Sequence, residues 1–132
     1  DYAEEMVQVC KAKYASFPNV SILVQQVEKL SFNSGSFDAI TCFGLFPHLE
    51  NKEEALRQMN RVLRKEGRLI IAHALSSTEL RNHHCKAELV VAQDWLPEGA
   101  KMKKLLKQAG FDKIQIQDEP GRYVCLSVKP QM

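Results

Sequence analysis

The side chains best suited to acid–base or metal chemistry are histidines that stand beside predicted strand and helix ends. His48 follows a strand predicted at 37–43, where an imidazole that titrates near neutral pH could act as a general base. Packing or capping beside a helix would explain the same histidine. His83, His84 and Cys85 are consecutive, so their side chains point to different sides of a helix, and no further ligands stand at a suitable spacing. We therefore name His48 as a candidate catalytic base and predict no metal site.

Two short apolar runs must position these residues. Residues 37–43 and 68–73 are rich in apolar and β-branched types and are bounded by turn residues, which is typical of strands buried in a parallel sheet. Asn51 and Glu54 form a capping-box pattern for a helix between them, and Gly67 is expected to end that helix. A strand, a helix and a second strand predict a right-handed βαβ unit. Its ligand crevice would lie at the carboxyl ends of the strands.

Three residues at the end of the first run should line that crevice with their backbone, namely Cys42, Phe43 and Gly44. The other elements follow from apolar periodicity and turn residues. They are a helix with an apolar stripe over 6–14, a strand at 20–24, a helix that begins at the capping box Ser76 to Glu79, a helix from Glu98 to Gly110, and an antiparallel pair of strands at 112–118 and 122–128.

Composition describes an ordinary globular protein. The 132 residues fit one domain, with 45% hydrophobic and 26% charged residues. A formal charge of +2 gives no support to nucleic-acid binding, and the lysines at 101–107 fit a solvated helix face. No run approaches the roughly 18 apolar residues of a membrane span, and no signal peptide is visible, so a cytoplasmic location is expected. Reduced thiols are expected because no C-x-x-C pair occurs among Cys10, Cys42, Cys85 and Cys125.

Several short motifs then occur in an order that resembles class I S-adenosylmethionine-dependent methyltransferases. The small-molecule branch that includes ubiquinone and menaquinone biosynthesis methyltransferases is the most similar. The motifs are Asp1-Tyr2-Ala3-Glu4-Glu5-Met6, residues 25–32, Gly35-Ser36-Phe37-Asp38-Ala39-Ile40, His48-Leu49 and residues 61–69. The resemblance covers nearly the whole chain and is strongest over 1–75. It implies an α/β fold with a three-layer, Rossmann-like sheet, mostly parallel with a C-terminal antiparallel hairpin.

The same resemblance identifies a feature that these 132 residues lack. In the family, a first strand and a loop with a Gly-x-Gly core precede the position of Asp1, and none of the six glycines here forms Gly-x-Gly. We therefore expect an N-terminally truncated, partial methyltransferase domain over 1–132, which alone binds the cofactor weakly or not at all. The missing strand would lie beside the 37–43 strand, so we also expect self-association through an exposed sheet edge. The 20–24 strand would be separated from the sheet, paired elsewhere or completed by another chain.

The resemblance also implies contacts to S-adenosylmethionine. Asp1 would accept bonds from the ribose hydroxyls, although an N-cap for the first helix fits it equally well in physical terms. Tyr2 would lie beside the adenine or ribose. Gln26 could accept a bond from the adenine amino group, and Val27 would offer its backbone N–H to the ring. Gln26 and Glu28 could equally be ordinary polar loop residues.

The implied reaction is transfer of a methyl group to a small-molecule acceptor, carried out by a longer parent chain. His84 and Asp94 fall in the segment that covers the substrate side in similar methyltransferases, so they are candidate substrate contacts. The acceptor atom stays open between carbon, oxygen and nitrogen. A non-catalytic, truncated or degenerate domain that serves as an interaction module is the alternative. A nicotinamide-dependent oxidoreductase would need G-x-G-x-x-G after a strand, which this sequence does not contain.

Overall fold

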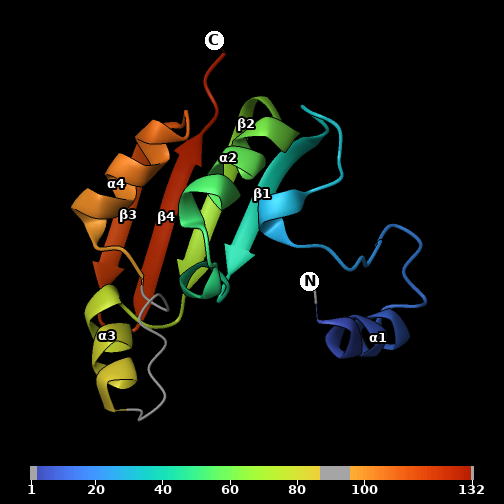
Figure 1. Ribbon diagram of the computed structural model, residues 1–132, viewed down its shortest axis with the longest axis horizontal. Coiled ribbons are helices and arrows are strands. Elements are labelled where there is room, and N and C mark those ends of the chain that lie inside the picture. The colour runs from blue at the N-terminus through green and yellow to red at the C-terminus, as the bar shows by residue number, and fades with distance from the viewer. Residues whose placement is uncertain (1–2, 87–95, 132) are drawn as a thin grey trace.

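A computed structural model describes residues 3–86 and 96–131, with α-helices and strands arranged as Figure 1 shows. In chain order the elements are α1 (Glu4–Lys13), the 3₁₀ helix η1 (Val27–Lys29), β1 (Phe37–Phe43), the 3₁₀ helix η2 (Phe46–His48), α2 (Lys52–Val62), β2 (Leu63–His73), α3 (Ser77–Lys86), α4 (Gly99–Gln108), β3 (Asp112–Glu119) and β4 (Arg122–Val128). Within these described ranges, none of the helices combines the length and the apolar character that crossing a membrane requires.

The four strands form one sheet in the order β1-β2-β4-β3. β1 and β2 are parallel neighbours, with Ile40 opposite Leu69, which confirms the predicted βαβ unit. β2 pairs antiparallel with β4, and β4 pairs antiparallel with β3 in the predicted C-terminal hairpin. Three of the four strands therefore run in one direction, and only β4 is reversed. The carboxyl ends of β1 and β2 meet at one end of the sheet (Figure 1).

The crossover helix α2 begins as its sequence predicts. The Asn51 side chain accepts a hydrogen bond from the Glu54 N–H at 3.0 Å. The prediction that α2 continues to Gly67 is wrong, because the helix ends at Val62 and the chain enters β2 at once. Backbone bonds with the C-terminal segment explain the early end: the Glu66 N–H donates to the Lys129 carbonyl at 2.7 Å, and the Lys129 N–H donates back to the Gly67 carbonyl at 2.9 Å.

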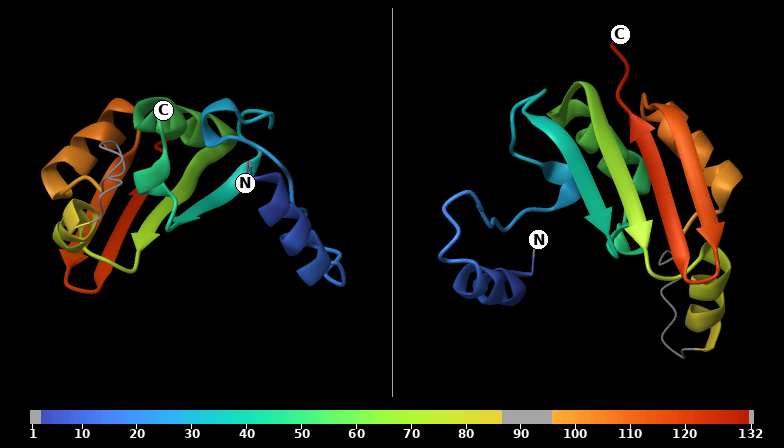
Figure 2. Two further views of the ribbon diagram at one scale, coloured as in Figure 1. Left: turned by 60° about the horizontal axis from the view of Figure 1, so that its bottom comes forward. Right: turned by 180° about the vertical axis from the view of Figure 1, so that it is seen from behind.

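Helices α2 and α4 lie across the same face of the sheet (Figure 1). Most of their buried residues belong to the hydrophobic core. Seen from behind, the opposite face carries no helix of the described residues (Figure 2, right). Two of the three predicted layers are thus present within the part of the chain that the structure describes. The core between them is made of fully buried side chains from both helices and the central strands, among them Leu56, Met59, Leu69, Ile71, Met102, Leu106, Tyr123 and Cys125.

Helix α3 is held against the C-terminal hairpin at its first turn. Ser76 and Glu79 form the predicted capping box, in which each side chain bonds the other residue's N–H at 3.0 Å. Glu79 also accepts from the Gly121 N–H in the hairpin turn, and Asp118 accepts from the N–H and hydroxyl of Ser77. These contacts join two segments that are about 40 residues apart in the chain.

The N-terminal part of the chain packs differently. α1 lies to the side of β1, away from the other helices (Figures 1 and 2). The predicted strand at 20–24 is wrong, because none of the described strands pairs with these residues. Ten large apolar side chains of the described residues are exposed, and nine of them precede residue 46. They are Met6, Val9, Tyr14, Phe17, Val20, Leu23, Val24, Phe43, Leu45 and, beyond that point, Leu126.

Candidate functional site

A hollow of about 1000 Å³ opens at the carboxyl end of β1, where the parallel strand pair ends. Five predicted site residues line it: Gln26 and Val27 from the start of η1, Phe43 and Gly44 from the end of β1, and His48 from η2. The structure therefore brings together three segments that the sequence analysis nominated separately. The remaining lining residues are Gln25, Glu28, Lys29, Leu45, Leu49, Glu50, Asn51 and Glu54.

The end of β1 turns sharply into the hollow. Phe43 is 68% exposed although it belongs to a strand, so its ring offers an apolar surface to the hollow. Gly44 has a φ of 67°, a left-handed conformation that residues with a Cβ rarely adopt. Its N–H still donates to the Ala72 carbonyl at 3.0 Å, which extends the β1–β2 pairing by one residue. A glycine is thus required where the chain leaves the sheet and starts the wall formed by η2.

A buried lysine fixes that wall. Lys52 is only 8% exposed, and its ammonium donates to the carbonyls of Pro47 at 3.2 Å and Leu49 at 3.1 Å. These two carbonyls flank His48, whose side chain is exposed at the hollow. Lys52 therefore sets the position of the turn that presents His48. Sequence reasoning missed this role, because a lysine in the first turn of a helix carries no signal of burial.

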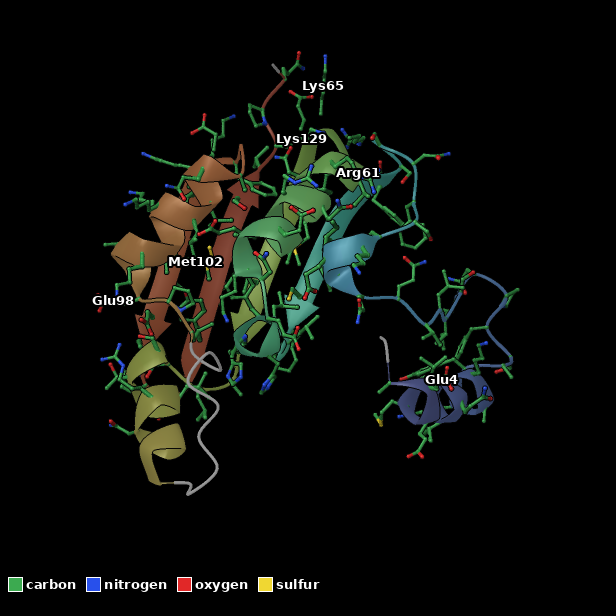
Figure 3. All side chains as sticks on the ribbon, in the orientation of Figure 1. Glu4, Arg61, Lys65, Glu98, Met102 and Lys129 are labelled. Atoms are coloured by element: carbon green, nitrogen blue, oxygen red, sulfur yellow. The ribbon has the colours of Figure 1, made fainter. Side chains whose placement is uncertain are left out.

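An arginine holds the opposite wall. Arg61, near the end of α2, donates to the carbonyls of Leu30 at 3.0 Å and Phe32 at 2.8 Å, in the segment that follows η1. Its side chain spans the space between α2 and this segment (Figure 3). The Gln25 side chain also accepts from the Ser31 N–H at 3.1 Å. Together these bonds place the start of η1, with Gln26 and Val27, opposite Phe43.

The lining of the hollow combines apolar side chains, three carboxylates and the ammonium of Lys29. Val27, Phe43 and the two leucines at 45 and 49 are apolar, while carboxylates come from Glu28, Glu50 and Glu54. Hydrogen bonds from Arg57, and then from Gln58, lower the pKa of Glu54 to about 2, so this carboxylate stays charged at neutral pH. Flat apolar surfaces beside amide and carboxylate groups suit a ligand that has a planar ring and several hydroxyl or amino groups.

Cys42 faces a different part of the molecule from Phe43. Its side chain is buried and lines a second, mostly apolar hollow of about 270 Å³ along β1. Burial raises the pKa of the Cys42 thiol to about 11, although a backbone hydrogen bond at Phe46 lowers it in part. The thiol is therefore protonated at neutral pH and is not a nucleophile.

Four nominated positions cannot be placed in the hollow. Asp1, Tyr2 and Asp94 lie outside the described residues, and His84 belongs to α3 with a side chain that is outside them. Their roles toward ribose and substrate stay predictions. Among the side chains that the structure describes, which leave out those of 83–95, no group of three or more His, Cys, Asp or Glu residues is arranged to hold a metal ion.

Known sequences that are similar to this chain are methyltransferases. A family model for the methyltransferase domain matches residues 1–71. The demethylmenaquinone methyltransferase of Staphylococcus haemolyticus is 28% identical over an alignment of 144 positions, gaps included, which covers 92% of this chain and 60% of the relative. The ubiquinone/menaquinone biosynthesis C-methyltransferase of Geotalea uraniireducens is 33% identical over 75 residues, which cover 54% of this chain and 32% of the relative. The chain thus spans about 60% of the length of the first of these relatives.

Comparison with solved structures shows the same fold. A SAM-dependent methyltransferase from Thermotoga maritima superposes with a TM-score of 0.78 at 19% identity, covering 98% of this chain and 71% of that protein. A SAM-dependent methyltransferase from Aquifex aeolicus gives a TM-score of 0.72 at 20% identity, covering 98% of this chain and 66% of that protein. The order β1-β2-β4-β3 with its terminal hairpin is therefore an arrangement that recurs in solved methyltransferase structures.

Proposed function

The chain belongs to the methyltransferase-domain family, and from this premise we propose that it contributes the adenosine side of a site for S-adenosylmethionine, in an enzyme that methylates a small molecule. One observation carries the proposal. Gln26, Val27, Phe43, Gly44 and His48 come from three separate segments and line a single hollow at the carboxyl end of β1. That end of a parallel pair is where open α/β sheets bind their ligands.

The residues around the hollow fit an adenosine in their chemistry. The Phe43 ring and the Val27 side chain supply apolar surface for a planar base, and a Gln26 amide can both accept from and donate to such a base. Val27 is the first residue of η1, so its N–H has no partner within that helix and is free to meet a ring nitrogen. Asp1 and Tyr2 stay proposed contacts to the ribose and adenine, and Cys42 a proposed backbone contact.

The chemistry needs little from the protein beyond positioning. S-adenosylmethionine, when bound, supplies a methyl group already activated on a sulfonium. Residues of this chain orient the ligand and exclude water, which is how bound reactants gain most of their rate enhancement. His48 is exposed at the hollow, where it is suited to take a proton from an acceptor that carries one. His84 and Asp94 remain proposed substrate contacts.

The class of acceptor is proposed from the relatives. Two proteins similar to this chain are methyltransferases named for demethylmenaquinone and for ubiquinone or menaquinone biosynthesis, so a quinone precursor is the first acceptor to test. A cytoplasmic location is part of the same proposal. It is supported by Cys10, Cys42 and Cys125, which are all free thiols in the structure, as expected in a reducing compartment.

A titration with adenosine followed by NMR tests the ligand assignment, because it detects weak as well as strong binding. We expect the largest amide shifts at Gln26, Val27, Phe43 and Gly44, and a Phe43→Ala variant should abolish them. Leu126→Ala removes another exposed apolar side chain, from β4, and should leave the shifts unchanged. Shifts scattered over other surfaces would refute the assignment and favour a non-catalytic interaction domain.

A further inference from the structure

Three polar side chains form a row across the sheet where β2 ends. His73 is the last residue of β2, Tyr123 of β4 lies directly opposite it, and Asp118 of β3 lies opposite Tyr123. Residues directly opposite each other in an antiparallel pair share one face of the sheet. Tyr123 is fully buried in the core that the helices cover, so all three side chains of this polar row lie on the helix-covered face.

Each member of the polar row bonds the backbone of the connection between β2 and α4. At the start of the connection, His73 Nδ1 accepts from the Leu75 N–H at 3.2 Å. Asp118 accepts from the N–H of Ser77 at 2.8 Å and also from its hydroxyl. At the end of the connection, the hydroxyl of the third member of the row, on β4, donates to the Pro97 carbonyl at 2.6 Å. The polar row thus holds the connection at both ends.

These bonds are shielded from water. Ser77 is 4% exposed, Pro97 is among the fully buried side chains, and Tyr123 is 0% exposed. Breaking a buried hydrogen bond costs more than breaking an exposed one, because a group left without a partner cannot turn to solvent. Burial raises the pKa of the Tyr123 phenol far above its usual value, and the Cys125 thiol and the Asp118 carboxylate add to this. The hydroxyl therefore keeps the proton that it donates.

The polar row stands beside the hollow at the carboxyl end of β1. Gly44 lines that hollow, and its N–H donates to the carbonyl of Ala72, the residue that precedes His73. α3 lies beyond the same end of the sheet (Figure 1). Open α/β sheets bind ligands outside the carboxyl ends of their strands. The connection therefore borders this crevice on the side of β2, whereas the proposed adenosine contacts come from η1 and β1.

We propose that His73, Tyr123 and Asp118 are positioning residues for the methyl acceptor. By holding both ends of the connection, they give the crevice a fixed wall on the side of β2, against which an aromatic acceptor is oriented toward the adenosine side. Orientation of the reactants is the main contribution that a protein makes to such a transfer. This role rests on the proposed function, because it concerns the acceptor side of the same site. It also requires the two ends of the connection to loosen together, since Asp118 and Tyr123 are direct neighbours.

Amide exchange tests whether the two ends are held together. Tyr123→Phe removes only the hydroxyl at the end of the connection. We expect exchange to become about 2- to 10-fold faster at Met102, in the first turn of α4, and also at Leu80, in the first turn of α3. Tyr14→Phe is the matched control, because it removes the same atom from an exposed side chain beside α1 and should change neither amide. Equal acceleration throughout β2, or acceleration at Met102 alone, overturns the proposal.

Asp118 allows the hydrogen bond to be separated from the charge. Asp118→Asn keeps a carbonyl oxygen that can accept from the Ser77 N–H, whereas Asp118→Ala removes the acceptor. The Asn variant should keep exchange at Leu80 and Met102 within about twofold of the unaltered chain, and the Ala variant should accelerate both by about 2- to 10-fold. An Asn variant that exchanges as fast as the Ala variant contradicts the role of this bond.

A titration with 1-naphthol, a fused aromatic ring with one hydroxyl, tests the acceptor side by NMR. We expect amide shifts within 74–80, and at least about twofold weaker binding to Tyr123→Phe, because a preset wall favours binding. Adenosine shifts at Gln26 and Phe43 should be the same in both proteins. Naphthol shifts confined to other surfaces, or equal affinity for both proteins, overturn the acceptor role. The exchange measurements involve no ligand, so their failure counts against the polar row alone, whereas a failed adenosine titration counts against the proposed function.

Discussion

Residues 20–24 and 69–71 have similar sequences, but only residues 69–71 form part of a strand. Both are short runs dominated by leucine, isoleucine or valine. The later run is the centre of β2, with β1 on one side and β4 on the other, and Leu69 and Ile71 are buried. The earlier run lies outside the sheet, and Leu23 and Val24 are nearly half exposed.

The difference shows that strand composition describes how well a segment would fit a sheet, and not whether an edge is available to it. A strand gains stability from cross-strand pairs and from burial on its faces. β2 has both, because the hairpin of β3 and β4 returns to pair with it. Residues 20–24 have no strand partner within the described residues, and Val20, Leu23 and Val24 are exposed to water.

Replacing one leucine in each run by alanine should lower the free energy of unfolding by very different amounts. Leu69→Ala leaves a cavity in the core, and we expect it to lower the free energy of unfolding by about 2 to 5 kcal/mol. Leu23→Ala removes a half-exposed side chain and should change it by less than about 0.5 kcal/mol. Urea denaturation measures both. Equal losses would mean that residues 20–24 are packed in solution.

Arg61 in α2 bonds the segment that follows residues 20–24, so removing these bonds should sharpen the contrast between the two regions. Arg61→Met deletes the donors to the Leu30 and Phe32 carbonyls, and hydrogen bonds to charged groups contribute about 1.5 to 3 kcal/mol. Amide exchange should accelerate in residues 27–35 and not in β2. Arg57→Met, which removes only an exposed ion pair with Glu54, is the control and should leave exchange unchanged. Uniform acceleration would contradict a local role for Arg61.

Replacing Lys52 should lower the free energy of unfolding only slightly, but it should move the turn that presents His48. Lys52→Met loses two hydrogen bonds to carbonyls but no longer buries a charge, so the net cost should be about 1 kcal/mol. The turn at 46–48 should move, and the amide resonances of η2 should shift, whereas Lys103→Met on the exposed face of α4 should shift neither. Unchanged η2 resonances would show that Lys52 does not position His48.

Acid should loosen the contact between α3 and the hairpin. The hydrogen bond from the Gly121 backbone, and then those from Ser76, hold the pKa of Glu79 below its usual value. A carboxyl with a depressed folded pKa contributes stability above its unfolded pKa and loses it as the pH falls through the folded value. Glu79→Gln should therefore be less stable near neutral pH, and its melting temperature should fall less on acidification. Parallel pH profiles for both proteins would contradict this.

Much of the fold could be predicted because its signals are local. The capping boxes at Asn51 and Ser76, the stripe of α2 and the hairpin turn at 119–121 each act within a few residues. The end of α2 was mispredicted, because Gly67 is a common helix stop and the residue that redirects the chain is Lys129, more than 60 residues later. Such long-range bonds leave no local pattern.

The candidate site likewise contains residues that the sequence could predict and residues that it could not. Phe43 and Gly44 could be predicted from their place at a strand end, since topology alone puts ligands there. Gln26 and Val27 required a resemblance to a known family, because nothing in their own types distinguishes them from an ordinary polar turn. Lys52 was out of reach, since its contacts exist only once η2 has folded against α2.

The place of β2 in the middle of the sheet has a consequence for synthesis on the ribosome. His73 ends β2, and Lys129, which bonds the carbonyls of Asn60 and Leu63, is translated 56 residues later. At about 5 to 20 residues per second, this interval lasts roughly 3 to 11 seconds. During it, the nascent chain carries β2 with an open edge where β4 will pair. A chaperone that binds extended apolar segments would find Leu69 to Ile71 accessible during that window.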